Sequence, residues 1–141
     1  MEIKILPLSP LFKMPVQAYP TDACFDVYAT SREFLGDKRV KYGLGFAVEI
    51  PPGTRLDLRA RSSVHKTGLS LSNDTGTIDH GFAGEVSAVF YHVSPMLPPY
   101  EVGDRIGQIK LEKVIPIEFK IVSELSETLR GENSYGSSGL K

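Results

Sequence analysis

Short stretches of alternating apolar and polar residues, separated by glycine and proline, are the feature that most limits how this chain folds. Residues 54–61 show the pattern well, because Leu56, Leu58 and Ala60 fall on one face of an extended chain. The residues between them are charged: Arg55, Asp57, Arg59 and Arg61. A period of two is typical of a β-strand with one buried face, so we expect a charged outer face here.

The same pattern predicts further strands along most of the chain. They are expected at residues 3–8, 24–30, 39–50, 69–72, 85–93, 105–115 and 117–122. The strand at 39–50 should bend at Gly43 and Gly45, one helical turn is expected near Ser63–Thr67, and a frayed turn across Ser123–Leu129. Many short strands joined by glycine and proline turns indicate an all-β sandwich or barrel, built as a single domain.

Charge and composition exclude several classes of partner. With 16 basic and 17 acidic residues the net charge is −1, which disfavours binding to nucleic acid through its phosphates. No apolar run approaches the ~18 residues of a membrane span, so no membrane partner is expected. The single cysteine, Cys24, rules out an internal disulfide framework, and the first ten residues do not have the form of a signal peptide. These features predict a soluble, cytoplasmic protein.

Residues 76–85, GTIDHGFAGE, place one acid, Asp79, among closely spaced glycines. Glycines at this density mark tight turns, where the backbone can approach a ligand closely. An acid in such a turn can be held in one orientation and aimed at a substrate. The ten residues alone fit equally well a hairpin that carries a solvated aspartate with no chemical role.

Other catalytic patterns are weak. The three histidines are scattered, and none has the spacing of a zinc site. A Ser-His-Asp triad is not excluded by spacing, but no serine lies in a nucleophile-elbow context. The glycine-rich end, residues 131–138, follows the outline of a phosphate loop, but Ser137 replaces the lysine and no helix can follow. A phosphate-loop nucleotidase is therefore excluded, although the amides and hydroxyls of this segment remain suited to wrapping a phosphate.

Five stretches, taken together and in order, resemble the five motifs of the trimeric dUTP diphosphatases. They are TDACFDVYA (21–29), RARSSVHKTGL (59–69), NDTGTIDHGFAGEV (73–86), GDRIGQIKL (103–111) and RGENSYGSSG (130–139). The family fold is a jelly-roll-like β-barrel, in agreement with the strand pattern. The resemblance implies a barrel domain at residues 1–129 and a flexible C-terminal lid at residues 130–141.

The resemblance also implies an activity. Family members hydrolyse dUTP to dUMP and pyrophosphate with Mg²⁺, which lowers dUTP and supplies dUMP for thymidylate synthesis. They are homotrimers whose active sites lie between subunits. By similarity, Asp79 is the catalytic base that orients and deprotonates the attacking water, and Asp26 holds Mg²⁺ through water.

The remaining implied roles concern substrate binding. Arg61, Ser62, Ser63 and Gln108 would hold the triphosphate. The segment with Asn73, Gly76, Thr77 and Ile78 would form a uracil slot, Phe82 would pack on the sugar, and Ser87 completes this set. In the tail, Tyr135 would stack on uracil, and the phosphates would be held by Arg130, Gly136, Ser137 and Ser138.

Several positions depart from the usual family pattern. Phe82 stands where tyrosine is usual, and Tyr135 where phenylalanine is usual. Cys24 replaces a glycine before Asp26, which makes the first motif the least certain. Asn133 and Ser134 occupy positions where glycine is common. None of these changes removes a residue that the resemblance assigns to the chemistry.

Two other functions remain to be weighed. A dCTP deaminase shares the fold and the Arg-Ser-Ser motif, but its glutamate position corresponds to Val89 here, and a valine cannot shuttle protons. A non-catalytic β-module is the second alternative. The presence of Asp79, Arg61 and Gln108 argues against it.

Overall fold

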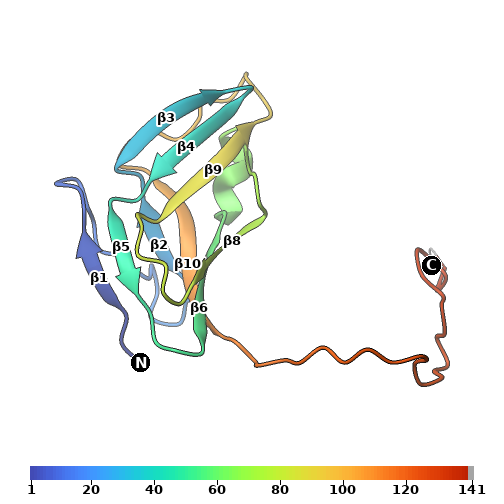
Figure 1. Cartoon of the computed structure of the whole chain (residues 1–141). Coiled ribbons are helices and arrows are strands. Elements are labelled where there is room, and N and C mark those ends of the chain that lie inside the picture. Colours follow the sequence, from blue (N-terminus) through green and yellow to red (C-terminus); the bar gives the residue numbers. More distant parts are fainter. Residues whose placement is uncertain (140–141) are drawn as a thin grey trace.

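The computed structural model describes residues 1–139, which form ten antiparallel strands and one short 3₁₀ turn (Figure 1). In chain order the strands are β1 (Lys4–Pro7), β2 (Phe25–Tyr28), β3 (Ser31–Gly36), β4 (Arg39–Gly43), β5 (Phe46–Glu49), β6 (Thr54–Arg59), β7 (Leu69–Leu71), β8 (Thr75–Asp79), β9 (Ser87–His92) and β10 (Arg105–Lys113). The turn η1 (Ser62–Lys66) lies between β6 and β7, which confirms the helical turn expected there. The predicted all-β, jelly-roll-like fold is confirmed.

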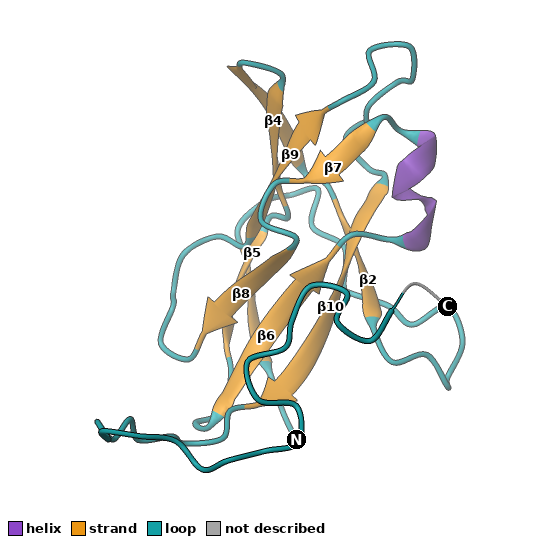
Figure 2. Ribbon diagram, turned by 90° about the vertical axis from the view of Figure 1, so that its right-hand side faces the viewer, coloured by secondary structure: helices purple, strands orange, loops and turns teal. Residues whose placement is uncertain are grey.

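The strands form two four-stranded sheets and one two-stranded sheet. The first large sheet has the order β2-β10-β6-β8, the second β3-β4-β9-β7, and β1 pairs with β5. Figure 2 shows β6, β8, β10 and β2 side by side, with η1 next to β7. Both large sheets contribute side chains to one apolar core, for example Leu58 and Ile106 from the first and Val40 and Phe90 from the second.

An aromatic group in this core fixes the loop that leads into β10. Tyr42, Phe90 and Tyr100 contact one another edge to face, with ring centroids 5.7 to 6.2 Å apart. The Tyr42 hydroxyl donates a hydrogen bond of 2.8 Å to the Tyr100 carbonyl, and Arg32 Nη1 donates another of 3.0 Å to the same oxygen. The backbone at Tyr100 is therefore held from two sides.

The prediction of one continuous strand at residues 39–50 was wrong. The chain forms β4 and β5, which belong to different sheets, and Gly45 between them has a φ of +71°. Glycine is also needed at position 43, because a Cβ there would lie 2.5 Å from Glu85 Oε1. The two glycines were correctly identified as the bend, but the bend is sharp enough to move the chain from one sheet to another.

Strand β3 was not predicted. Its residues SREFLG lead into a tight turn in which Asp37 and Lys38 have φ values of 49° and 61°. Two successive residues with positive φ are typical of a type I′ hairpin turn, for which Asn-Gly or Asp-Gly is the usual sequence. The sequence here is Asp-Lys, so the usual hairpin signature is absent.

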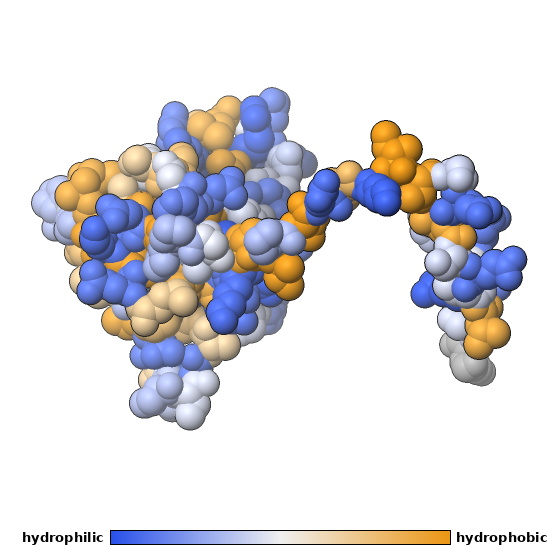
Figure 3. All heavy atoms as spheres, turned by 60° about the horizontal axis from the view of Figure 1, so that its bottom comes forward, coloured by the Kyte–Doolittle hydropathy of each residue, from blue (hydrophilic) through white to orange (hydrophobic). Residues whose placement is uncertain are grey.

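The predictions for residues 117–122 and Ser123–Leu129 were also wrong, because neither a strand nor a helix forms there. We call residues 114–139 the arm. Figure 1 shows the arm leaving the body of the protein, and Figure 3 shows uncovered apolar residues along it. The backbone hydrogen bond from Val114 N to Gly53 O, 2.9 Å long, is the last that joins the described part of the arm to the body.

The charged face predicted for residues 54–61 contains one exception. Asp57 is only 2% exposed. Its carboxylate is covered by neighbours on its own strand: Arg55 Nε lies 2.9 Å from Oδ1, and Arg59 Nη2 lies 3.6 Å from Oδ2. The alternation places Asp57 on the polar face correctly, but it does not show that the two arginines fold over it.

Candidate active site

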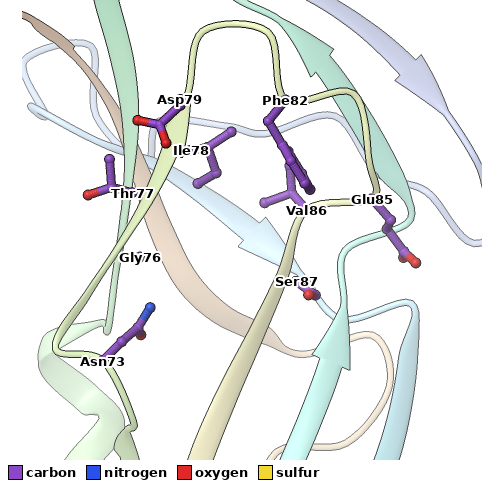
Figure 4. A pocket seen from close by; sticks show the side chains of 9 residues that line it. All are labelled: Asn73, Gly76, Thr77, Ile78, Asp79, Phe82, Glu85, Val86 and Ser87. Atoms are coloured by element: carbon purple, nitrogen blue, oxygen red, sulfur yellow. The ribbon is translucent and has the colours of Figure 1, made fainter.

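A cavity of about 210 Å³ lies between β8 and β9 (Figure 4). It is lined by Asp79, by all six residues predicted for the uracil slot and the sugar contact, and by two residues that were not predicted. The full lining is Asn73, Gly76, Thr77, Ile78, Asp79, Phe82, Glu85, Val86 and Ser87. We call residues 73–87, which wrap around this cavity, the arch.

The sequence suggested a hairpin for this stretch. The arch is not a hairpin, because its two strands do not pair with each other. β8 pairs with β6 in the first sheet, and β9 pairs with β4 and β7 in the second. The loop at residues 80–86 therefore crosses from one sheet to the other. A hydrogen-bonded hairpin would hold its strands about 4.8 Å apart and leave no space for a ligand. The cavity exists because the strands diverge.

Side chains of the arch point to opposite sides. Figure 4 shows Ile78 and Phe82 pointing into the space between the strands, whereas the Asp79 carboxylate points away from it. Alternation along β8 explains this difference, because adjacent residues of a strand face opposite ways. Asp79 is exposed, while Ile78 is 9% exposed. Asp79 thus stands at the rim of the cavity, while Ile78 and Phe82 supply apolar walls.

Local contacts hold the arch in shape. The Phe82 ring lies where a Cβ at Gly84 would come within 2.7 Å of it, so glycine lets the ring fold back over the chain. Glu85 Oε1 accepts a hydrogen bond of 2.9 Å from Gly45 N, and His80 Nδ1 lies 2.8 Å from Ile50 O. These contacts tie both ends of the loop to the segment around β5.

A second group of predicted residues gathers around Asp26, whose side chain is 4% exposed. Arg61 Nε lies 3.3 Å and Gln108 Nε2 3.3 Å from Oδ1, and Arg105 Nη1 lies 3.0 Å from Oδ2. Gln108 lies directly opposite Asp26 in the pairing of β10 with β2. We call Asp26, Arg61, Arg105 and Gln108 the ionic cluster. Charge-assisted hydrogen bonds of this kind hold both arginines and the amide in fixed positions.

The ionic cluster borders a cavity of about 410 Å³. Two predicted residues, Arg61 and Ser63, line it, together with residues that sequence analysis did not assign to the site: Lys66, Thr67, Pro98, Pro99, Tyr100, Asp104 and Arg105. Arg105 and Lys66 lie within stretches that were singled out, although neither was assigned a role, whereas nothing in the sequence pattern marked Tyr100. Three cationic side chains around one cavity suit a polyanion.

The cluster also bears on the expected metal. Among residues 1–139 no group of three or more His, Cys, Asp and Glu side chains comes together. Mg²⁺ commonly binds through one or two carboxylates, several waters and substrate phosphates. Asp26 fits that limited role, since it is a carboxylate set among groups that suit phosphate. Its service as a magnesium ligand stays a prediction.

One chain does not bring the two groups together. Gln108 lies opposite Arg59, and Arg59 lies opposite Thr75, which is four residues before Asp79 on β8. Four residues of a strand span about 13 Å, and the three strand spacings from β8 to β2 add about 14 Å across the sheet. Asp79 and Asp26 are therefore separated by roughly 15–20 Å of sheet.

The predicted tail residues lie apart from both groups. Tyr135 is fully exposed with a φ of 43°, and Arg130 Nε donates a hydrogen bond of 2.9 Å to Asn133 O. The other tail residues, Gly136, Ser137 and Ser138, are exposed as well. The predicted lid ends at residues 140–141, which lie outside the described part of the chain. The substrate contacts predicted for Arg130, Tyr135 and residues 136–138 stay predictions.

No helix within residues 1–139 has the length and the apolar character that a membrane crossing requires.

Comparisons with known proteins agree with this geometry. A family model described as dUTPase matches residues 11–139. The deoxyuridine 5'-triphosphate nucleotidohydrolase of Nocardia farcinica is 38% identical over 135 residues, which cover 94% of this chain and 82% of that protein. The protein of the same name from Corynebacterium diphtheriae is 37% identical over 141 residues, covering 98% and 93%.

Solved structures show the same likeness. The dUTPase of Staphylococcus bacteriophage 80alpha with dUPNHPP superposes with a TM-score of 0.84 at 26% identity, covering 99% of each chain. The dUTPase from phage phi11 of S. aureus has a TM-score of 0.75 at 23% identity, covering 91% of this chain and 100% of that one; at this identity the likeness concerns the fold. The family match spans both the arch and the ionic cluster, and the chain belongs to the dUTPase family.

Proposed function

We propose that the protein hydrolyses dUTP to dUMP and pyrophosphate in the cytoplasm, and so lowers dUTP and supplies dUMP for thymidylate synthesis. The observation that carries the proposal is the cavity of the arch, which has both polar and apolar walls and an exposed carboxylate, Asp79, at its rim. The relatives named deoxyuridine 5'-triphosphate nucleotidohydrolase and the phage 80alpha dUTPase solved with dUPNHPP support the same substrate. Conversion of dCTP by deamination has no comparable support, because Val89 supplies no proton-transfer group.

The arch suits uracil in size and chemistry. Its backbone at Asn73, Gly76 and Thr77 can pair with the polar edge of the base, while Ile78 packs against the ring. Cytosine exchanges a donor for an acceptor and would leave buried partners unpaired, which is a heavily penalised error. The Phe82 ring, folded over Gly84, would lie against the sugar and offer no partner to a ribose hydroxyl.

Asp79 would act as the general base. Its carboxylate takes a proton from a water, whose oxygen attacks the α-phosphorus while the bond to the bridging oxygen of pyrophosphate breaks. Positioning a water for such a displacement needs no covalent intermediate. The exposure of Asp79 and its orientation away from the apolar space support this role, because the water and the phosphate must both reach it.

The triphosphate would be held by the residues around the ionic cluster. Arg61 and Gln108 already point their donors at one carboxylate, and an arriving phosphate competes for the same donors. Ser62 and Ser63 add hydroxyls and backbone amides at η1. When bound, Mg²⁺ would neutralise charge on the departing pyrophosphate, and Asp26 would hold waters of its shell.

The distance between the arch and the ionic cluster supports a site shared between subunits. Reacting atoms must approach within about 3–3.5 Å, so the Asp79 of one chain and the cluster of the same chain cannot serve one triphosphate. A homotrimer, in which the arch of one copy meets the cluster of another, removes the difficulty.

The arm supports the same assembly. Ile115, Ile117, Phe119 and Ile121 are 72–99% exposed and alternate like one face of a strand. An uncovered apolar face of this length marks a contact with another chain. The barrel domain would comprise residues 1–129, and residues 130–141 would close over a partner's site as a lid, with Tyr135 stacking on the base and Arg130, Gly136, Ser137 and Ser138 on the phosphates.

A substrate screen tests the proposal. The protein is incubated with each deoxyribonucleoside and ribonucleoside triphosphate plus Mg²⁺, and pyrophosphate and ammonia are assayed in parallel. We expect pyrophosphate from dUTP and little from the others. Ammonia from dCTP would indicate a deaminase instead, and no product from any nucleotide would indicate a non-catalytic module.

A further inference from the structure

Tyr100 presents an unpaired polar atom in a rigid setting. The residue is 7% exposed, and its hydroxyl is buried without a hydrogen-bond partner within the described residues. Its ring packs edge to face on Tyr42 and Phe90, and its carbonyl accepts two hydrogen bonds. A buried hydroxyl without a partner destabilises the folded state, because it has lost its hydrogen bonds to water. The protein would therefore be more stable with phenylalanine at position 100. The presence of tyrosine points to a function for the hydroxyl.

Tyr100 is one of the residues around the cavity that borders the ionic cluster. Tyr100 lines this cavity together with Arg61 and Ser63. Burial raises the pKa of the Tyr100 phenol, while the Arg61 charge and the Ser63 hydroxyl act in the opposite direction. The phenol thus remains protonated at neutral pH and is available as a donor beside Ser63.

We propose that Tyr100 is a positioning residue that acts through Ser63. Its O–H donates to Ser63 Oγ when substrate is bound, so that the single hydrogen of Ser63 points outward to a phosphate oxygen. Hydrogen bonds in such a chain polarise and strengthen one another. This inference rests on the proposed function, because it assumes that Ser63 faces the triphosphate.

The geometry favours this relay over a direct contact with substrate. The Tyr100 hydroxyl is inaccessible to solvent, whereas Ser63 is partly exposed at η1. A serine hydroxyl rotates freely and has one hydrogen, so its use as a phosphate donor depends on a neighbour that occupies its lone pair. Tyr100 is rigid enough to be that neighbour without losing entropy on binding.

The test begins with Tyr100→Phe, which removes one oxygen and keeps the ring. We expect kcat/KM for dUTP to fall about tenfold, mainly through KM, while the inhibition constant of deoxyuridine, which has no phosphate, stays the same. The melting temperature should stay equal or rise, since an unpaired buried group is lost. The matched control is Tyr42→Phe, which removes a hydroxyl that is hydrogen-bonded in the structure, and which should lower the melting temperature.

A double-mutant cycle with Ser63→Ala decides whether the effect passes through Ser63. In the Ser63→Ala background, Tyr100→Phe should have little further effect on kcat/KM. Independent, multiplicative losses would overturn the relay, as would an unchanged KM in Tyr100→Phe or a fall in its melting temperature like that of Tyr42→Phe. If the unaltered protein releases no pyrophosphate from dUTP, the proposed function fails first, and the two failures are thereby distinguished.

Discussion

The arch and the ionic cluster are built in different ways, although both are lined by residues of the same chain. The arch is shaped by backbone path and packing: two strands diverge into separate sheets, and a phenylalanine folds over a glycine. The cluster is shaped by charge, with two guanidinium groups and an amide around one buried carboxylate. Under the proposed function, the shape of the arch would select the base and the charge of the cluster would hold the phosphates. Substitutions in the two regions should therefore fail in different ways.

The largest effect is expected at the rim of the arch. Asp79→Asn keeps the size of the side chain but removes the base, so kcat for dUTP should fall about 10³-fold or more. Binding of a non-hydrolysable dUTP analogue, measured by calorimetry, should remain nearly unchanged. Full turnover in this variant would sink the assigned mechanism.

Removal of residues 130–141 should have the next largest effect. Both the arch and the cluster would still form, since their residues precede the arm, yet turnover should fall at least about 10²-fold because the lid no longer orders the substrate. Circular dichroism and size-exclusion chromatography should show an intact fold and assembly. A monomeric or unfolded product would contradict the assignment of this segment as a lid.

Two buried aspartates, Asp26 and Asp57, allow the role of charge in the ionic cluster to be compared with that of a buried charge outside it. Asp26→Asn should lower the free energy of unfolding by about 1–3 kcal/mol, because two partly exposed arginines lose their shared carboxylate. It should also lower kcat/KM for dUTP about tenfold, as the loss of a supporting contact typically does.

Asp57→Asn is the matched control for this experiment. Asp57 is equally buried and also contacts two arginines, but those arginines belong to neither region. Urea unfolding should show a comparable loss of stability, with kcat/KM little changed. Equal losses of activity in both variants would mean that the cluster acts only through stability.

Alkaline pH should lower the free energy of unfolding through Tyr42, whose hydroxyl donates to the Tyr100 carbonyl beside the cluster cavity. Burial raises the pKa of Tyr42 to about 12, against 10.0 for the free phenol. Between these values the unfolded chain loses a proton that the folded chain keeps, so stability falls as pH rises above 10, by up to about 2–3 kcal/mol. Unfolding by urea at pH 9 and pH 11 measures the difference, and the pH dependence should shrink in Tyr42→Phe.

The smallest effect is expected from a single methyl group in the arch. Gly84→Ala would place a Cβ 2.7 Å from the Phe82 ring and push the ring aside. The preference for dUTP over UTP, measured as a ratio of kcat/KM values, should then fall several-fold while the fold keeps its melting temperature. An unchanged ratio would show that the position of the ring does not determine sugar selectivity.

Period-two patterns predicted the strands well where a partner strand exists. Residues 54–61 and 105–115 became β6 and β10, which lie side by side in the first sheet. Residues 117–122 carry the same alternation and form no strand, because no segment within residues 1–139 pairs with them. Alternation predicts that a segment has an apolar face to bury, but it does not identify the segment or subunit that buries this face.

The site was predicted less completely than the fold. The resemblance identified seven of the nine residues that line the cavity of the arch, since close glycine spacing and one acid mark that stretch strongly. It could not show that the arch spans two sheets, which depends on pairings between distant strands. Tyr100 escaped notice because its loop carries no pattern, and only the packed structure brings it to Ser63.

The crossing of the arch has a consequence for evolution and engineering. Because one wall of the cavity belongs to each sheet, its width follows the thickness of the core between the sheets. The arch returns to the core at Val86, whose N–H donates 2.9 Å to Phe46 O and whose carbonyl accepts 3.0 Å from Leu44 N. If the cavity holds the base as proposed, core residues that line no part of it would act as spacers and influence which base fits. Substrate choice can drift or be tuned through the volume of the interior, with every residue that touches the ligand left as it is.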